Sequence, residues 1–367
     1  MPASAGRRFY NRRGQISNSD DPRCSPVSVA GPALMIIDVH AHALSEKFLS
    51  DLQRDTVAGW SSERDAKGGF WIRRPGEQPH SLDPNLHDMR RRLESLRRRR
   101  VECQLFGPSP GFMAWQGGAA GVELARTVNA HAKEIEAQSQ GLMEAMAILP
   151  LGEPERAVAE LERAVDEDGF RSIMLPTSAG GRPLDDAAFA DLFAVIERRE
   201  LLAFMHPTSA FPTDRFGING MNVLLGWPFE TTLAVARLIF GGVFERHPAL
   251  KLILSHSGGN LMFLRGRLDA AYDATGWEAH PYYRKHINRR PTFYLDRLYY
   301  DTCALSAGSI AFTLDTMSDR YVLFGSDYPF DVGDPEGAVA FPIILALSPQ
   351  RQARILRDNA RALLGAP

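Results

Sequence analysis

Short apolar runs rich in β-branched residues alternate along the chain with longer segments in which apolar residues recur at helical spacing. The apolar runs have the length and composition of parallel strands covered on both faces. They span residues 36–42, 101–108, 145–150, 172–177, 201–206, 251–256, 298–303 and 321–327. Helical patterns fit residues 85–100, 122–140, 153–168, 230–246, 260–275 and 306–318. Eight strands in strict alternation with helices predict an α/β fold, a closed (β/α)8 TIM barrel, with a doubly wound open sheet as the alternative.

Two segments stand apart from this alternation. Residues 43–83 form a long connection after the first strand, and we expect them to make a small insertion. Residues 1–34 are rich in arginine and serine and have no periodic apolar pattern, which predicts a disordered N-terminal extension. Residues 35–367 are therefore expected to form one barrel domain.

The first strand ends in two histidines on one face. Side chains two positions apart on a strand point the same way, so Asp38, His40 and His42 share a face. The other face, Ile37, Val39 and Ala41, is apolar throughout and suits packing against helices. The histidines are therefore expected to point into the barrel. Asp38 either orients a ligand imidazole or makes a structural hydrogen bond, and the sequence leaves both open.

Three further strands end with an inward polar residue. The same alternation places His206, His256 and Asp327 beyond the apolar layers of their strands. Active sites of barrels are built where the strands end, so these groups are expected to converge there for metal binding or proton transfer. Neutral imidazoles with one carboxylate favour Zn²⁺, and Mn²⁺ is the alternative cofactor.

Composition narrows the class of protein. Lys+Arg of 42 against Asp+Glu of 44 gives a net charge of −2, so we expect no nucleic-acid partner. The three cysteines show no CxxC spacing, which fits a reducing, cytoplasmic location. No uninterrupted apolar stretch has the length of a membrane span, so no membrane association is expected. An arginine-rich run over residues 90–100 is expected to be the solvated face of a helix.

The ordered motifs resemble those of a known superfamily. They are IDVHAH at 37–42, MHP at 205–207, GGVFERHP at 241–248, SHSGG at 255–259 and FGSDYP at 324–329. As a set they resemble the amidohydrolase superfamily, and more narrowly its branch of decarboxylases that act on aminocarboxymuconate semialdehyde and hydroxylated benzoates. The resemblance covers about residues 35–365.

The resemblance implies a role for each candidate residue. By it, His40, His42, His206 and Asp327 are metal ligands, His256 is the catalytic acid/base, and Asp327 is also a possible proton donor. Arg267 resembles an arginine that grips a substrate carboxylate in a neighbouring subunit's site, which implies a homodimer. Arg73 or Arg74 resembles a second carboxylate clamp. Thr208 stands where the aminocarboxymuconate members tend to carry tryptophan.

The expected function is that of a metal-dependent decarboxylase, a carboxy-lyase acting on a small unsaturated or aromatic carboxylic acid. A hydrolase or hydratase of a lactone or dicarboxylate could use the same residues, because a metal-activated hydroxide serves that chemistry as well. A non-catalytic scaffold that keeps the site is a further alternative. Release of CO₂ against incorporation of water would separate the first two.

Overall fold

The structure is a computed structural model that describes residues 9–10, 16–17, 34–74, 79–113, 118–208, 216, 220–276 and 280–365. The chain divides into two units, Met1–Leu34 and Met35–Pro367. In the first unit, strand β1 (Phe9–Tyr10) pairs antiparallel with β2 (Ile16–Ser17). The rest of the extension lies outside the described residues, so its disorder stays a prediction.

Eight parallel strands form the centre of the second unit. They are β3 (Ile36–Asp38), β7 (Val101–Phe106), β8 (Met143–Ala145), β9 (Ser172–Leu175), β12 (Leu202–Met205), β13 (Lys251–Leu254), β14 (Tyr299–Asp301) and β15 (Val322–Leu323). Ladders join β3, β7 and β8 in one sheet and β9, β12, β13, β14 and β15 in another. Parallel bridges Ala147–Ile173 and Ala41–Tyr328 connect the two sheets on both sides. The sheet therefore closes on itself, which confirms the predicted barrel and excludes the open sheet.

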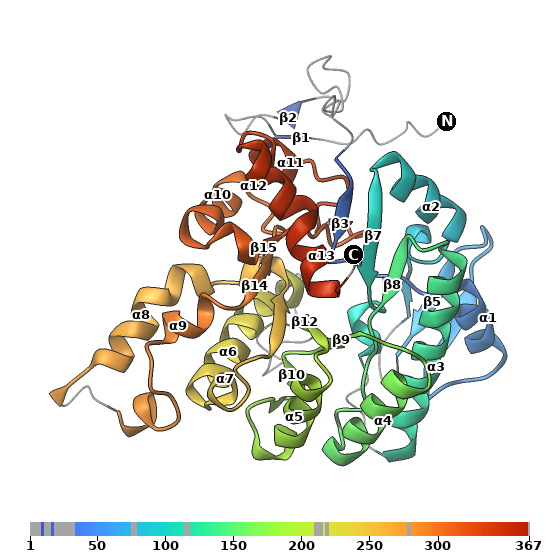
Figure 1. The fold of residues 1–367 in the computed structure, drawn as a ribbon. Coiled ribbons are helices and arrows are strands. Elements are labelled where there is room, and N and C mark those ends of the chain that lie inside the picture. Colours follow the sequence, from blue (N-terminus) through green and yellow to red (C-terminus); the bar gives the residue numbers. More distant parts are fainter. Residues whose placement is uncertain are drawn as a thin grey trace. The chain divides into compact units, whose positions relative to one another are not determined.

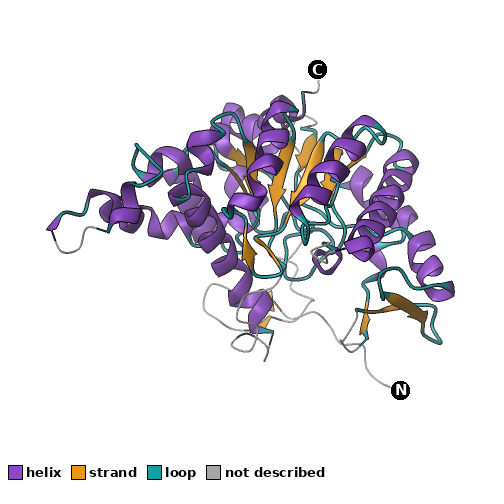
Figure 2. Cartoon of the chain, turned by 90° about the horizontal axis from the view of Figure 1, so that it is seen from below, coloured by secondary structure: helices purple, strands orange, loops and turns teal. Residues whose placement is uncertain are grey.

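Helices surround the strands, as Figures 1 and 2 show. The principal ones are α2 (Met89–Arg98), α3 (Gly118–Gln138), α4 (Pro154–Asp166), α5 (Ala190–Arg198), α6 (Trp227–Phe240), α8 (Leu261–Asp273) and α10 (Ala307–Thr316). Shorter ones are α7 (Val243–Arg246), α9 (Pro291–Leu295), α11 (Ala340–Ile344), α12 (Pro349–Ala353) and α13 (Asn359–Leu364). The single helix predicted over 230–246 is wrong. It breaks between α6 and α7 because Gly242 has φ +72°, and a Cβ there would meet the His286 carbonyl oxygen at 2.6 Å.

Residues 43–83 fold into a small substructure after β3. Helix α1 (Glu46–Arg54) is followed by an antiparallel sheet of β4 (Ser61–Arg64), β5 (Phe70–Arg73) and β6 (His80–Ser81). Phe70 and Ile72 alternate on the buried face of β5 and join Trp60 in the main hydrophobic core. The insertion is thus anchored to the barrel by its apolar face.

The arginine-rich run on α2 departs from the expectation of a solvated face at two positions. Arg92 and Arg99 are buried, whereas the other arginines of the run are exposed. The guanidinium of Arg92 donates to the carbonyl of His42 and, at 2.8 Å, to Gln104 Oε1. It also lies over the ring of Tyr328, 4.2 Å from the centroid. The buried arginine supports the strand ends on which the histidines stand, and this role accounts for its position.

One described helix, Asn222–Phe240, is long and apolar enough to cross a membrane by length and composition alone. It contains α6, and 44% of its apolar window is buried inside the protein. Such burial is typical of a helix that covers a barrel. The absence of a membrane partner stays a prediction.

Candidate active site

Residues that lie just past the ends of three barrel strands meet at one end of the barrel. His40 and His42 follow β3, His206 follows β12, and Asp327 follows β15. Ring centroids are 5.4 Å apart for His40 and His42, 5.2 Å for His40 and His206, and 4.9 Å for His42 and His206. Asp327 Oδ1 lies 3.2 Å from His40 Nε2 and 3.0 Å from His42 Nε2. The structure thus brings together the four residues expected to be ligands.

Each of the three buried imidazoles is held through its Nδ1 atom. His42 Nδ1 lies 2.9 Å from the carbonyl of Pro108, and His206 Nδ1 lies 2.7 Å from the carbonyl of Pro207. His40 Nδ1 lies 2.6 Å from Asp301 Oδ2. A carbonyl or carboxylate can only accept, so Nδ1 donates and Nε2 is the ring nitrogen that faces the cluster.

Four buried atoms of this cluster have no hydrogen-bond partner among the described residues. They are the Nε2 atoms of His40, His42 and His206 and the Oδ1 atom of Asp327. Buried polar atoms are nearly always satisfied in native proteins, so four unsatisfied atoms facing one another need a common explanation. Three imidazole nitrogens and a carboxylate oxygen are the donor set of a divalent metal site, and the residues therefore fit such an ion.

The ionisation of the cluster agrees with this reading. Burial lowers the pKa of His42 and takes that of His206 well below its usual value, so both imidazoles are neutral. Burial would also lower the pKa of His40, but Asp327 and Asp301 raise it to about 10. Burial would raise the pKa of Asp327, yet the surrounding histidines, His40 foremost, hold it well below its usual value. The set therefore offers two neutral imidazoles and a carboxylate, together with His40, whose Nε2 proton a cation would replace.

His256 belongs to the same cluster but differs in its surroundings. It follows β13, its Nε2 lies 3.4 Å from Asp327 Oδ2, and its side chain is 14% exposed. The donor atoms of His40, His206, His256 and Asp327 all lie within 4.8 Å of one another, so geometry alone would also admit His256 as a ligand in place of His42. We favour His42, because its Nε2 is buried without a hydrogen bond, whereas His256 is partly exposed and its Nε2 is hydrogen-bonded to Asp327 Oδ2.

The strand ends that carry His256 and Asp327 have an unusual backbone. His256, Ser257 and Asp327 have φ of 54°, 52° and 57°. Non-glycine residues rarely adopt this left-handed region, and they cluster at functional sites when they do. Gly258 continues the turn at φ +73°, where a Cβ would lie 2.8 Å from the ring of Tyr300. The Ser-Gly-Gly sequence after His256 is thus what allows the chain to turn there.

Asp301 is a residue of the site that the sequence analysis did not identify, although side-chain alternation along its strand indicates it. It lies on β14, is fully buried, and its Oδ1 accepts from the backbone N–H of Ser257 at 2.8 Å while its Oδ2 faces His40. Side-chain alternation along residues 298–303 places Asp301 on the same face as Cys303.

Asp38 has the second of the two roles that the sequence left open, a structural hydrogen bond. It accepts from Ser326 Oγ and Gln104 Nε2 at 2.6 and 2.8 Å and contacts no ligand imidazole, so its hydrogen bonds are structural.

The predicted substrate arginines lie apart from this cluster. Arg73 is exposed at the end of β5, where it is paired with Ser61, and Arg74 is half-buried beside it. Arg267 is exposed on α8. None of them is among the residues that gather around Asp327, and their roles stay predictions.

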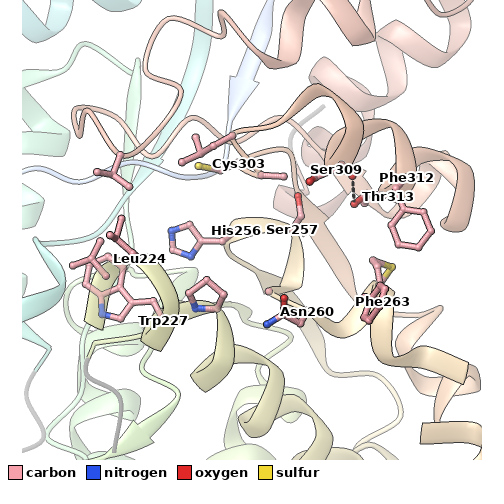
Figure 3. A pocket seen from close by; sticks show the side chains of 17 residues that line it. Leu224, Trp227, His256, Ser257, Asn260, Phe263, Cys303, Ser309, Phe312 and Thr313 are labelled. Carbon is pink, nitrogen blue, oxygen red and sulfur yellow. Dashed lines mark hydrogen bonds between the residues drawn. The ribbon is translucent and has the colours of Figure 1, made fainter. Parts of the chain in front are cut away.

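A cavity of about 520 Å³ opens beside His256. Figure 3 shows Leu224 and Trp227 on one side of His256 and Phe263 and Phe312 on the other. Trp227 also contacts the cluster, with its ring edge-on to His206 at 5.3 Å and stacked on His256 at 6.2 Å. Its indole N–H donates to the carbonyl of Thr208 at 2.9 Å. Strand alternation could not predict this contact, because Trp227 stands on α6 and not on a barrel strand.

Comparisons with known proteins agree with the geometry. Residues 37–366 match the family described as amidohydrolase. The chain is 28% identical to 2-amino-3-carboxymuconate-6-semialdehyde decarboxylase of Dictyostelium discoideum, over 90% of this chain and 91% of that protein. It is 27% identical to gamma-resorcylate decarboxylase of a Rhizobium species, over 79% of this chain and 91% of that one. The solved structure of a dihydroxybenzoic acid decarboxylase from a Polaromonas species, with bound manganese and the inhibitor 2-nitroresorcinol, is similar at a TM-score of 0.71 and 22% identity, covering 90% of this chain and 97% of that one.

Proposed function

This chain belongs to the amidohydrolase family, and from that premise we propose that it is a metal-dependent decarboxylase of a small unsaturated or aromatic carboxylic acid. The observation that carries the proposal is the set of four buried, unpartnered donor atoms of His40, His42, His206 and Asp327, beside a histidine that reaches a cavity. The relatives named above are decarboxylases, which favours loss of CO₂ over hydrolysis.

The proposed ion is Zn²⁺, held by the four unpartnered donors, with Mn²⁺ as the alternative. Imidazole and carboxylate ligands suit both ions. The bound manganese of the Polaromonas enzyme supports the alternative. When bound, the ion would supply a Lewis acid that stabilises negative charge on a substrate oxygen.

His256 is proposed to move the proton. In decarboxylation the bond between the carboxyl carbon and its neighbour breaks, CO₂ leaves, and the electron pair that stays behind takes up a proton. His256 is the member of the cluster that faces the cavity, and Ser255 Oγ lies 3.1 Å from its Nδ1. Asp327 is only 2% exposed and is enclosed by imidazoles, so it is the better ligand and His256 the better proton donor.

A homodimer in the cytoplasm completes the proposal. Leu225, Phe229 and Leu233 are spaced by four along the helix Asn222–Phe240, and their side chains are 49%, 51% and 55% exposed. An exposed apolar stripe of this kind supports a protein interface. Arg267 would reach the partner's substrate across this interface. Arg73 or Arg74, on the insertion, would bind a carboxylate of the substrate.

The proposed location is the cytoplasm. Cys103 and Cys303 are free thiols, which suits a reducing compartment.

The test is a reaction screen with purified, metal-loaded protein. Aromatic and muconate-type acids would be incubated with it in ¹⁸O-labelled water, while substrate absorbance and CO₂ release are followed. We expect stoichiometric CO₂ and no ¹⁸O in the organic product. Product that carries ¹⁸O without CO₂ release would establish the hydrolase or hydratase instead.

A further inference from the structure

Among the described histidines of the cluster, only His256 has its Nδ1 atom against a hydroxyl group. This atom lies 3.1 Å from the Oγ atom of Ser255. The Nδ1 atoms of the other three histidines lie against two backbone carbonyls and a carboxylate, which only accept. A hydroxyl both donates and accepts, so it can pair with Nδ1 whether that atom carries a proton or a lone pair. The ring of His256 is therefore held in a different way from the rings of the proposed ligands.

Ser255 is placed to act on His256 alone. It directly follows β13 and is fully buried. Its backbone N–H donates to the carbonyl of Met205 at 3.2 Å, and its carbonyl accepts from the N–H of Gly258 at 3.0 Å, so its main chain is fixed. Within the described part of the chain its Oγ has no hydrogen-bond partner besides His256 Nδ1. A hydroxyl that is closed off from solvent cannot pass a proton onward, so Ser255 is suited to orient the ring and not to relay protons.

The other nitrogen of the His256 ring faces Asp327. Nε2 lies 3.4 Å from Asp327 Oδ2, and a carboxylate accepts, so Nε2 carries the proton of this hydrogen bond. A half turn of the ring about the Cβ–Cγ bond would put carbon atoms in both places, and this torsion has little preference of its own. The indole of Trp227 is stacked on the ring, as Figure 3 shows, but a stacked neighbour contacts both orientations alike. The two hydrogen bonds therefore decide which edge of the ring faces the cluster.

We propose that Ser255 is a positioning residue for proton transfer by His256, because its hydroxyl holds Nδ1 while Nε2 gives up and regains a proton. This inference rests on the proposed function and deepens it. In the transfer the Nε2–H bond of the imidazolium breaks and its electron pair stays on nitrogen. The proton forms a C–H bond with the electron pair that the departing CO₂ leaves on carbon. Nδ1–H donates to Ser255 Oγ throughout, and solvent returns the proton to Nε2, since the side chain of His256 is 14% exposed.

A spectroscopic test observes the hydrogen bond directly. ¹⁵N-histidine-labelled protein saturated with Zn²⁺ is studied by NMR, and the signals of His256 are assigned from their loss in His256→Gln. In the neutral ring of the wild type, Nε2 should carry the proton and Nδ1 should accept from Ser255. Ser255→Ala should move the Nδ1 resonance toward that of an unprotonated nitrogen without a hydrogen bond. Ser255→Thr keeps the hydroxyl and should leave the resonance near its wild-type position.

The matched control is Ser172→Ala. Ser172 is also fully buried on a barrel strand, but its Oγ contacts the carbonyl of Ala145 at 3.4 Å. This variant should leave the His256 resonances unchanged. An Nδ1 resonance that Ser255→Ala does not move, or that both alanine variants move equally, would overturn the inference.

A kinetic test asks whether the hydrogen bond matters for turnover. Ser255→Ala should lower kcat about tenfold, the equivalent of one hydrogen bond, with metal content, melting temperature and KM close to those of the wild type. Ser255→Thr should recover most of the loss, and Ser255→Cys, whose thiol is a weak donor, should fall between serine and alanine. A wild-type kcat in Ser255→Ala would overturn the inference. A loss of kcat that follows the loss of metal, or that neither threonine nor cysteine reduces, would equally overturn it.

The two tests separate this inference from the proposed function. If the protein takes up no zinc, or no acid releases CO₂, the proposed function fails. The NMR comparison of the serine variants depends on neither result and is then made on the protein as purified. A hydrogen bond at Nδ1 that disappears in Ser255→Ala would still support Ser255 as the residue that orients His256, and its absence from the wild type would refute that role.

Discussion

At the scale of single residues, the histidines of the site are of two kinds. His40, His42 and His206 are fully buried and fixed through Nδ1, whereas His256 is partly exposed and contacts both Asp327 and the cavity. Three of them are therefore suited to hold an ion in place, and the fourth to exchange a proton with a substrate.

This division predicts different losses on substitution. His42→Ala removes a ligand, so the purified protein should contain much less metal than the wild type. His256→Ala should keep its metal and lose about 10²–10⁴-fold in kcat, the usual contribution of a general acid or base. Metal content, measured by mass spectrometry, and turnover of the best substrate test whether His42 is a ligand and His256 a proton donor. Equal metal loss from both variants would mean that His256 is itself a ligand.

Asp301 should act on the metal through His40. Asp301→Asn keeps the shape of the side chain but removes the charge that accepts from His40 Nδ1, and the loss of such a partner typically weakens metal affinity about 10–100-fold. A competition titration with a chelator measures that affinity. Asp38→Asn is the matched control, since Asp38 is equally buried but contacts no ligand imidazole. The same loss of affinity in the control would contradict a specific role for Asp301.

Much of the site could be predicted because side chains on a strand alternate strictly. That rule alone predicted that His40, His42, His206, His256 and Asp327 point into the barrel. It also predicts the same for Asp301, which lies two residues before the end of the predicted strand 298–303. Trp227 could not be found in this way. Its ring reaches His206 from α6, a separate segment of the chain, and contacts between separate segments have no local signature.

At the scale of elements, strand boundaries were less predictable than strand positions. The run 145–150 is apolar throughout, yet the ladder with β7 pairs Gln104–Phe106 with Met143–Ala145. Hydrophobicity marks residues that are buried, and several residues past the end of a ladder are buried as well. The same applies to the run 321–327, of which only Val322–Leu323 joins the ladder with β14 although burial continues to Pro329.

The junction between the insertion and α2 contains a group that should sense pH. His87 is buried edge-on against Phe70, and neither ring nitrogen has a hydrogen-bond partner among the described residues. Burial lowers its pKa below 6.5. The unfolded chain therefore binds more protons than the folded chain as the pH falls below 6.5, and the free energy of unfolding decreases, by up to about 1.4 kcal/mol per pH unit.

The substitution His87→Leu tests this expectation. Urea unfolding of the wild type should show a lower free energy of unfolding at pH 5.5 than at pH 7.5, and part of that decrease should vanish in the variant. An identical pH dependence in both proteins would show that His87 is protonated in the folded state too.

At the scale of the whole molecule, the exposed apolar stripe on the helix Asn222–Phe240 predicts assembly. Phe229→Asp places a charge at the middle of the stripe and should convert a dimer into a monomer, as measured by sedimentation velocity. Phe293→Asp, on α9 and outside the stripe, should leave the dimer intact. A wild-type protein that sediments as a monomer at all concentrations would refute the predicted homodimer.

The barrel closes where its own first and last strands, β3 and β15, meet, and the candidate site lies on that closure. Ser326 donates to Asp38 across 288 positions of sequence, and Asp327 lies against His40 and His42. A ribosome must therefore synthesise the chain as far as Asp327 before the four donors can come together. A nascent chain that ends before residue 327 lacks the carboxylate, so metal acquisition should be one of the last events of biogenesis.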